Sequence, residues 1–237
     1  MPRAVRWFLI AAVLVTGLAI AVPFLVPVSR LIPEITAIAS ESLGQPVKIG
    51  NLTAELLPTP RAVAEGVRIG RKDEVTIGEL EIVPDLFSYL AGVPKLALLR
   101  AEHVELKEAA LAIVDRMPKG GTPIEVRRVA LLDVRLQHQA LKLPPFNLDA
   151  RLGAGLEVET LRFSTRDETF KLSLDEEGAG IAGVKVEASR WRLPIAATPL
   201  LIDSLRAEGR LSGKRLELSK VESRQYGGTL NGSARAE

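Results

Sequence analysis

The chain of 237 residues contains no cysteine, which excludes disulfide bonds and thiolate chemistry. Its two histidines, His103 and His138, belong to no local histidine-carboxylate cluster at metal-ligand spacing, so we predict no metal site and no cofactor. Aromatic residues make up only 4% of the chain, too few for the stacking platforms that bind single-stranded nucleic acids. The net charge of +2 gives no electrostatic reason to expect a nucleic-acid partner.

Catalytic motifs are also missing. The sequence has no Gly-x-Ser-x-Gly nucleophile elbow, and Gly213-Lys214 lacks the preceding glycine of a phosphate-binding loop. Adjacent acids such as Asp73-Glu74 fall in turn-like segments, where carboxylates solvate loops far more often than they catalyse. We therefore predict no catalytic residues and no enzymatic activity.

The N-terminus carries the longest apolar run. Residues 7–28 are uncharged and, as a helix rising 1.5 Å per residue, would cover a hydrocarbon core of about 30 Å. Arg3 and Arg6 precede the run, which by the positive-inside tendency leaves the N-terminus in the cytoplasm and exports the rest. We predict a transmembrane anchor at residues 1–30. A cleaved signal peptide ending near Ala19-Ile20-Ala21 is the alternative, and it exports the body as well.

Periodicity then changes along the chain. Residues 30–43 show helical spacing and end at Gly44, and a second short helix is predicted at residues 85–91. From Val47 onward, apolar residues alternate with charged ones, which is typical of antiparallel strands with one dry face. The alternation slips at Gly78, where we expect a bulge. The Pro- and Gly-containing segment 118–123 separates an α+β region, residues 31–117, from an all-β region, residues 122–237.

Several motifs occur in an order that resembles a known family. After the anchor and the helix, four motifs follow one another along the chain. They are Gly44-Gln45-Pro46-Val47-Lys48-Ile49-Gly50, Leu56-Leu57-Pro58-Thr59-Pro60, Gly66-Val67-Arg68-Ile69-Gly70 and Phe87-Ser88-Tyr89-Leu90-Ala91-Gly92-Val93-Pro94. This order resembles the N-terminal region of the AsmA family, bacterial relatives of chorein-type lipid-transfer proteins. Two further motifs resemble strands of the family's C-terminal repeat region. They are Leu205-Arg206-Ala207-Glu208-Gly209-Arg210-Leu211-Ser212 and Tyr226-Gly227-Gly228-Thr229-Leu230-Asn231-Gly232. Many members of the family are several times longer than this chain.

The resemblance implies a taco-shaped open sheet whose inner face carries phospholipid acyl chains through the periplasm. It also implies anchoring in the bacterial inner membrane, with the body in the periplasm, and a role in intermembrane phospholipid transport and outer-membrane homeostasis. The expected partners are membrane phospholipids, the inner membrane and envelope proteins. The chain is therefore expected to be mainly β, with an N-terminal transmembrane helix, short helices and a curled antiparallel sheet that forms an open groove.

Alternation cannot distinguish an open groove from a closed β-sandwich or barrel, and without the resemblance it favours a closed core. In that alternative the protein is a non-enzymatic envelope scaffold or an outer-membrane protein assembly factor. If the groove is open, the residues expected to line it are the apolar members of the alternating strands. They are Val104, Leu106, Val129, Leu131, Leu156, Val158, Leu161, Phe163, Leu172, Leu174, Val184, Val186, Leu216 and Leu218.

Overall fold

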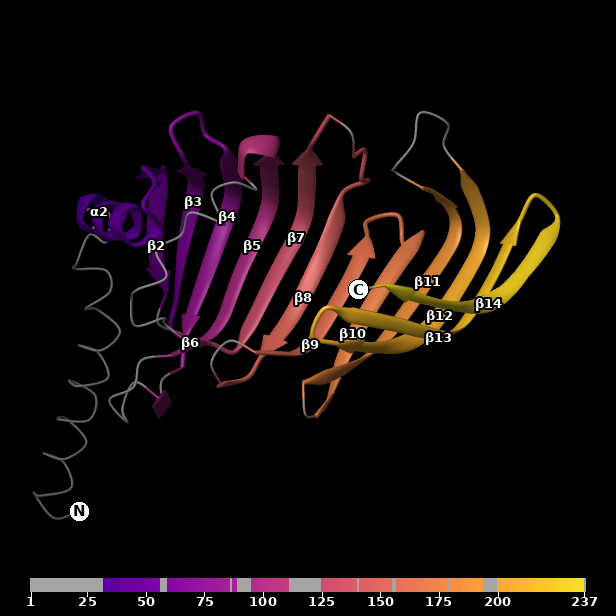
Figure 1. Cartoon of the computed structure of the whole chain (residues 1–237). Coiled ribbons are helices and arrows are strands. Elements are labelled where there is room, and N and C mark those ends of the chain that lie inside the picture. Colours follow the sequence, from indigo (N-terminus) through magenta and orange to yellow (C-terminus); the bar gives the residue numbers. More distant parts are fainter. Residues whose placement is uncertain are drawn as a thin grey trace, which may run out of the picture.

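A computed structural model of the chain describes residues 32–55, 59–85, 87–88, 95–110, 125–139, 141–154, 157–178, 180–193 and 200–236. Within these residues one helix, α2 (Ile32–Leu43), precedes a single sheet of 14 strands (Figure 1). The predicted helix at residues 30–43 is thus confirmed from Ile32 onward, and the prediction of a mainly β protein is confirmed. Of the second predicted helix, residues 87 and 88 are helical, and most of the remainder is not described.

The order of the strands in the sheet largely follows their order in the chain. The strands are β1 (Val47–Lys48), β2 (Asn51–Glu55), β3 (Arg61–Ile69), β4 (Val75–Pro84), β5 (Lys95–Lys107), β6 (Glu125–Val126), β7 (Arg128–Gln137), β8 (Phe146–Leu152), β9 (Val158–Thr165), β10 (Phe170–Gly178), β11 (Ile181–Arg192), β12 (Leu201–Ser212), β13 (Arg215–Gln225) and β14 (Gly228–Ala236). Their spatial order is β1-β3-β4-β5-β7-β8-β9-β10-β11-β12-β13-β14, with β2 on β3 and β6 on β5. Each long strand therefore pairs mostly with its neighbours in sequence, as in a meander.

One junction departs from the predicted antiparallel sheet. β5 pairs in parallel with β6 and β7, at Lys95↔Glu125 and Ala101↔Leu131. Parallel neighbours need a connection that returns the chain to the same end of the sheet, and the segment between Ala110 and Glu125 provides that length. The expectation of a fully antiparallel sheet is therefore wrong at this point. The two predicted regions, 31–117 and 122–237, contribute neighbouring strands to one sheet, and the boundary at 118–123 lies outside the described residues.

The sheet is open. Among the described residues, no pairing joins β14 to β1 or β2, so the strands form one layer without closure. Figure 1 shows this layer bending and twisting, so that β13 and β14 run across the direction of β3 to β8. The alternative of a closed β-sandwich is therefore wrong for this part of the chain. An alternating sequence pattern shows which face of each strand is apolar, but it does not show whether a second sheet covers that face. No helix within the described residues is long and apolar enough to cross a membrane, and the anchor predicted at residues 1–30 lies outside them.

A line of kinks crosses four neighbouring strands. Gly66, His103 and Asp133 have positive φ angles of 62°, 54° and 51°, and Gly78 lies between the first two in the sheet. A Cβ at Gly78 would lie 3.0 Å from the Cβ of His103, which explains why glycine occupies this position. Apolar residues on either side of the line are three apart instead of two, as in Ala64 and Val67. All four strands slip together, so the apolar side chains stay on one face and the slip predicted at Gly78 is confirmed. The bulge expected there is wrong, because the pairing with β3 and β5 runs through Gly78 without a register shift.

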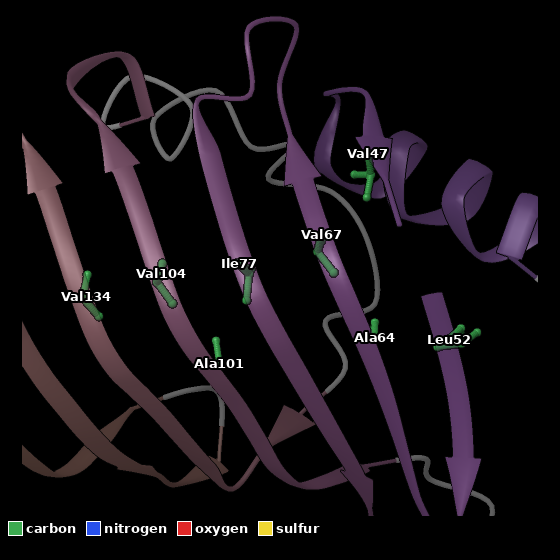
Figure 2. Close-up of a cluster of buried hydrophobic side chains, with 8 residues drawn as sticks. All are labelled: Val47, Leu52, Ala64, Val67, Ile77, Ala101, Val104 and Val134. Atoms are coloured by element: carbon green, nitrogen blue, oxygen red, sulfur yellow. The ribbon is translucent and has the colours of Figure 1, made fainter. Parts of the chain in front are cut away.

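The packed core lies at the N-terminal end of the sheet. Figure 2 shows its buried side chains on neighbouring strands from β1 to β7, and they are Val47, Leu52, Ala64, Val67, Ile77, Ala101, Val104 and Val134. Ile32, Ala39 and Leu43 of α2 pack against this cluster, so the helix covers part of the apolar face near β1 and β3. The Ser40 hydroxyl accepts a hydrogen bond from the Val47 backbone N–H at 2.9 Å and ties the helix to β1.

Gly209 is predicted to be essential for the β12–β13 pairing. A Cβ at this position would clash with the Glu217 carbonyl oxygen and lie 2.7 Å from the Leu218 Cα, both of which are backbone atoms. We expect Gly209→Ala to lower the free energy of unfolding by about 2 kcal/mol, since such overpacking forces the backbone to move. Gly232→Ala is the matched control, because no atom lies within 4 Å of its Cβ position. Equal denaturant midpoints for the two variants would contradict this account of the register shift at Glu208 and Gly209.

Candidate functional site

Cross-strand pairing places apolar residues in a first continuous row. In antiparallel and parallel pairs alike, directly paired residues point to the same face of the sheet. The row starts in β2 and ends in β14, and it skips only β6 among the strands between them. Its members are Leu52, Ala64, Leu80, Ala101, Leu131, Leu148, Phe163, Leu172, Val186, Ala207, Val221 and Gly232.

A second row runs beside the first on the same face. Its members are Ala54, Ala62, Ile82, Leu99, Val129, Ala150, Leu161, Leu174, Val184, Gly209, Leu218 and Ala234. The rows lie about 7 Å apart, because most partners in a strand are two residues apart. Eleven steps of about 4.8 Å between strands give each row a length of about 53 Å. Neither row contains a polar side chain, and we call the face that carries both rows the apolar face.

The described residues place no second layer over most of the apolar face. Within the described part of the chain, Val134 and Thr165 are the largest side chains with less than 2% of their surface exposed. A two-layer core buries Leu, Ile and Phe side chains to that degree. Here Leu172, Leu174 and Leu218 are only half-buried, and Leu230 on β14 is 57% exposed. The apolar face is therefore partly shielded by neighbours in the sheet and remains accessible from above.

Aromatic rings cluster on the apolar face across β8 to β11. The ring centroids of Phe146 and Phe163 are 4.9 Å apart, those of Phe163 and Phe170 are 5.9 Å apart, and those of Phe170 and Trp191 are 4.5 Å apart. Thr165 is buried beside them, and its hydroxyl accepts a hydrogen bond from the Phe170 backbone N–H at 3.0 Å. The Trp191 indole N–H has no hydrogen-bond partner in the described structure.

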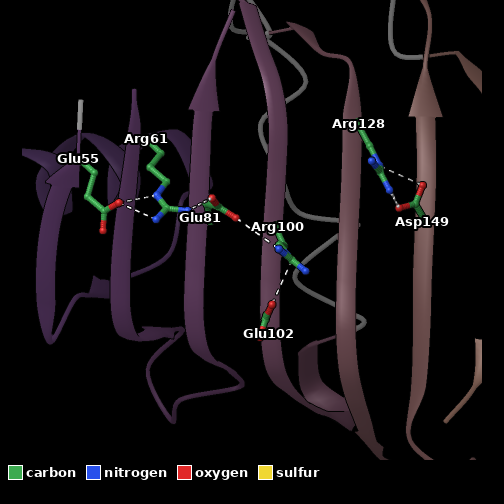
Figure 3. A network of polar contacts seen from close by, with 7 residues as sticks. All are labelled: Glu55, Arg61, Glu81, Arg100, Glu102, Arg128 and Asp149. Carbon is green, nitrogen blue, oxygen red and sulfur yellow. Dashed lines mark hydrogen bonds and ion pairs between the residues drawn. The ribbon is translucent and has the colours of Figure 1, made fainter. Parts of the chain in front are cut away.

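The opposite face carries charges. Figure 3 shows Arg61 on β3 between Glu55 on β2 and Glu81 on β4, with Arg100 and Glu102 on β5 continuing the network. The bond to Glu55, followed by that to Glu81, raises the pKa of Arg61 above its ordinary value.

The charged network continues along the sheet. Arg128 pairs with Asp149 at 2.6 Å, which raises the pKa of the arginine, and Arg162 pairs with Asp175 at 2.6 Å. Exposed pairs of this kind each contribute only about 0–1 kcal/mol. Their main effect is to keep this face wet, so the two faces of one sheet differ sharply in polarity.

Twelve of the predicted groove residues lie on the apolar face. Nine belong to the two rows, while Val104 and Leu106 pair with Ile77 and Val75, and Leu216 pairs with Leu211. Leu156 lies outside the described residues. Val158 pairs with Leu152 at a register shift and is 45% exposed, so it lies at the ragged end of β9 and not within the regular rows.

The sequence prediction missed part of this surface. Phe146, Leu148 and Val221 obey the same alternation and belong to the apolar face, so the period-two pattern could have identified them. Ala101, Ala150 and Ala207 were missed because alanine carries little pattern signal by itself. Phe170 was missed because it directly follows the turn at residues 166–169.

Two hollows lined by described residues lie mainly over the charged face, although Val184 and Gly209 of the second row also line one of them. They have volumes of about 640 and 510 Å³, lie over β10 to β14 and are lined mainly by charged-face residues such as Lys171, Glu187, Arg206 and Glu222. The larger hollow is lined by three acidic and three basic residues, whereas the smaller is lined by four acidic and two basic ones. The described residues include no cluster of three or more His, Asp or Glu side chains that could hold a metal ion. His103 is exposed, and its Nε2 atom lies 4.0 Å from Asp133.

No family model matches the chain, and neither the curated proteins nor the solved structures include a match.

Exchange of a methyl group for a hydroxyl tests whether the apolar face is covered. Val134 is fully buried, whereas Val186 is half-buried in the first row. We expect Val134→Thr to lower the free energy of unfolding by about 2 kcal/mol, because the hydroxyl is buried without a designed partner. The same change at Val186 should cost less than about 1 kcal/mol, because its hydroxyl can reach solvent. Chemical denaturation of delipidated protein would measure both, and an equally large loss at Val186 would indicate a covering layer.

Proposed function

We propose that the apolar face binds the acyl chains of membrane phospholipids and that the protein carries them as a non-enzymatic binding protein. The observation that supports this proposal is the pair of unbroken apolar rows on a face that the described residues leave largely uncovered. Acyl chains are the ligand class that matches a surface this long and this poor in polar groups.

The physical reason is the free energy of exposed apolar surface. Removing such surface from water is favourable by about 25 cal/mol per Å², and each buried methylene of a ligand adds about 0.8 kcal/mol. A face formed by two rows of about 53 Å therefore gains stability from any long apolar occupant. The lack of hydrogen-bonding groups in either row disfavours a polar ligand, because its donors and acceptors would stay unsatisfied.

The open side of the sheet suits a lipid in particular. A phospholipid can lay its tails on the apolar face while its headgroup remains in water, so the protein needs no buried polar site. Lipid tails in a bilayer are as apolar as leucine side chains, so movement of a tail from bilayer to protein changes its hydrophobic free energy little. Binding is then reversible, which transport requires.

The rest of the proposal follows the AsmA-like order of motifs. In it, residues 1–30 anchor the protein in the bacterial inner membrane and the sheet lies in the periplasm. The sheet forms a curled groove that contributes to phospholipid transport between membranes and to outer-membrane homeostasis. A row length of about 53 Å suits one segment of such a route better than a complete bridge.

Lipid retention is the first test. Native mass spectrometry of the detergent-extracted protein should show bound phospholipid, and organic extracts should contain it. Leu174→Glu should reduce the bound fraction at least tenfold, because it places a carboxylate between Leu161 and Val184 on the second row.

The matched control is the neighbouring substitution Ser173→Glu. Ser173 lies on the charged face opposite Arg162 and Lys185, which would pair with the new carboxylate, so lipid binding should be unchanged. Wild-type protein free of lipid in both measurements would contradict the proposal. A tightly bound polypeptide in place of lipid would favour the scaffold or assembly-factor alternative.

Trp191 provides a second, spectroscopic test. The chain has two tryptophans, and Trp7→Phe leaves Trp191 as the only indole. Trp191 packs with Phe170 on the apolar face and is 9% exposed, so we expect phospholipids with brominated acyl chains to quench its fluorescence by half or more. Headgroup-brominated lipid at the same concentration is the control and should quench less. Equal quenching by the two lipids would contradict contact between this cluster and the tails.

A further inference from the structure

Polar groups enter the apolar face at one end of the strands. Two residues beyond the first row, the cross-strand pairing continues in what we call the rim row, because it contains the first residue of β8, the last of β9 and the first of β10. Its members are Phe146, Thr165, Phe170, Ala188, Leu205 and Ser223. Thr165 and Ser223 are buried, so this row differs from the first two in carrying polar side chains.

Trp191 lies beyond the rim row, one residue before the end of β11. Arg190 has a positive φ of 48°, which reverses the alternation of β11 and returns Trp191 to the face that carries Ala188. Trp191 pairs with Ile202 and packs in one buried cluster with it and Ala188. The indole therefore lies where the apolar face meets the end of the strands.

The indole N–H of Trp191 is a buried donor without an acceptor. Trp191 is 9% exposed, and its Nε1 atom is closed to solvent and has no hydrogen-bond partner in the described part of the chain. The Thr165 hydroxyl beside the same rings differs, because it accepts the hydrogen bond of the Phe170 N–H at 3.0 Å. Buried tryptophans usually find a partner for this group, and leaving a buried donor unpaired costs free energy. The rim of the apolar face thus holds a donor that an occupant of the face can satisfy.

We propose that the Trp191 N–H donates a hydrogen bond to the ester carbonyl oxygen of an acyl chain bound on the apolar face. This assignment rests on the proposed function and adds to it the class of lipid, which is an acyl ester. Indole only donates, so its partner must be an acceptor. The ester carbonyl is a neutral acceptor joined directly to the chain that covers the rows. A free carboxylate or a phosphate would carry a charge into the cluster of Ala188, Trp191 and Ile202, which is unfavourable.

The length of an acyl chain fits this position. Along β11, the five residue steps from Val186 in the first row to Trp191 span about 17 Å at about 3.3 Å per step. One acyl chain covers half of a hydrocarbon core of about 30 Å, or about 15 Å. A chain with its ester at Trp191 therefore extends over the rim row to the first row, and its headgroup passes the end of the strands into water. Because the N–H is closed to solvent, the indole must turn to receive the ester, and the new hydrogen bond favours that movement.

Ester and ether lipids with the same chains separate this hydrogen bond from hydrophobic binding. Full-length protein in detergent is loaded from an equimolar mixture of dipalmitoyl phosphatidylglycerol and its dihexadecyl ether analogue, which lacks both carbonyl oxygens. Native mass spectrometry should show the ester retained over the ether by about fivefold or more. Trp191→Phe keeps a ring and removes the N–H, so it should bind both lipids and bring the ratio close to parity.

Thr165→Val is the matched control. It removes the neighbouring polar group of the same cluster and keeps the shape of the side chain. The hydroxyl is already engaged by the Phe170 N–H, so the ester preference should stay at the wild-type value. Loss of the preference in Thr165→Val but not in Trp191→Phe would assign the bond to the hydroxyl and overturn the proposal.

Nuclear magnetic resonance observes the N–H without a change at Trp191. In Trp7→Phe protein the Trp191 indole is the only one in the chain, so isotope labelling of the tryptophan nitrogen gives a single indole signal. Its proton should shift downfield when the diester binds and stay in place when the diether binds. Palmitate is the third probe, and a shift with palmitate alone would identify a free carboxylate as the acceptor and overturn the ester assignment.

Two further results would overturn the proposal. One is equal retention of the diester and the diether by the wild-type protein, and the other is an undiminished ester preference in Trp191→Phe. In both cases lipid is bound, so the proposed function stands while this assignment fails. Retention of neither lipid would contradict the proposed function, and the assignment would fail with it.

Discussion

The structure depends on one constraint, which is that every strand must present its apolar residues to the same face of a single layer. In a sandwich, a second sheet would still cover part of the apolar surface around a strand that slips by one residue. Here a slip would move a whole set of leucines and valines into water and a set of charges onto the apolar face. The unbroken rows from β2 to β14 show that the constraint holds across the sheet.

The line of kinks through Gly66, Gly78, His103 and Asp133 satisfies that constraint while the sheet bends. A residue with positive φ inside a strand reverses the alternation, so an isolated one would misalign its strand with both neighbours. Because four neighbouring strands reverse at the same height, their pairing is preserved above and below the line. Gly66, His103 and Asp133, the three residues of the line with positive φ, are of types that tolerate this conformation, whereas Gly78 is required by the close approach of His103.

The sequence predicted much of this fold for physical reasons that are visible in particular residues. Alternation in pairs such as Leu172/Leu174 and Val184/Val186 is local, so it identified both the strands and the face they share. The parallel pairing of β5 with β7 could not be predicted in the same way, because alternation has the same period in parallel and antiparallel strands. The sequence could not predict that the sheet is open either, because openness depends on which strands do not pair with each other and not on the pattern within any one strand.

The parallel junction between β5 and β7 also has a consequence for the order in which the chain folds. On either side of it, strands that follow one another in the sequence pair antiparallel, from β3 to β5 and from β7 to β14, so each side can form by pairing of sequence neighbours. The junction pairs residues far apart in the sequence, such as Ala101 and Leu131, so chain entropy is lost before any hydrogen bond forms, and such steps are slow. We expect two meanders to assemble first and the continuous apolar surface to form when they join. Until then each half has an unpaired strand at the junction, which is the point where chaperones would be needed most.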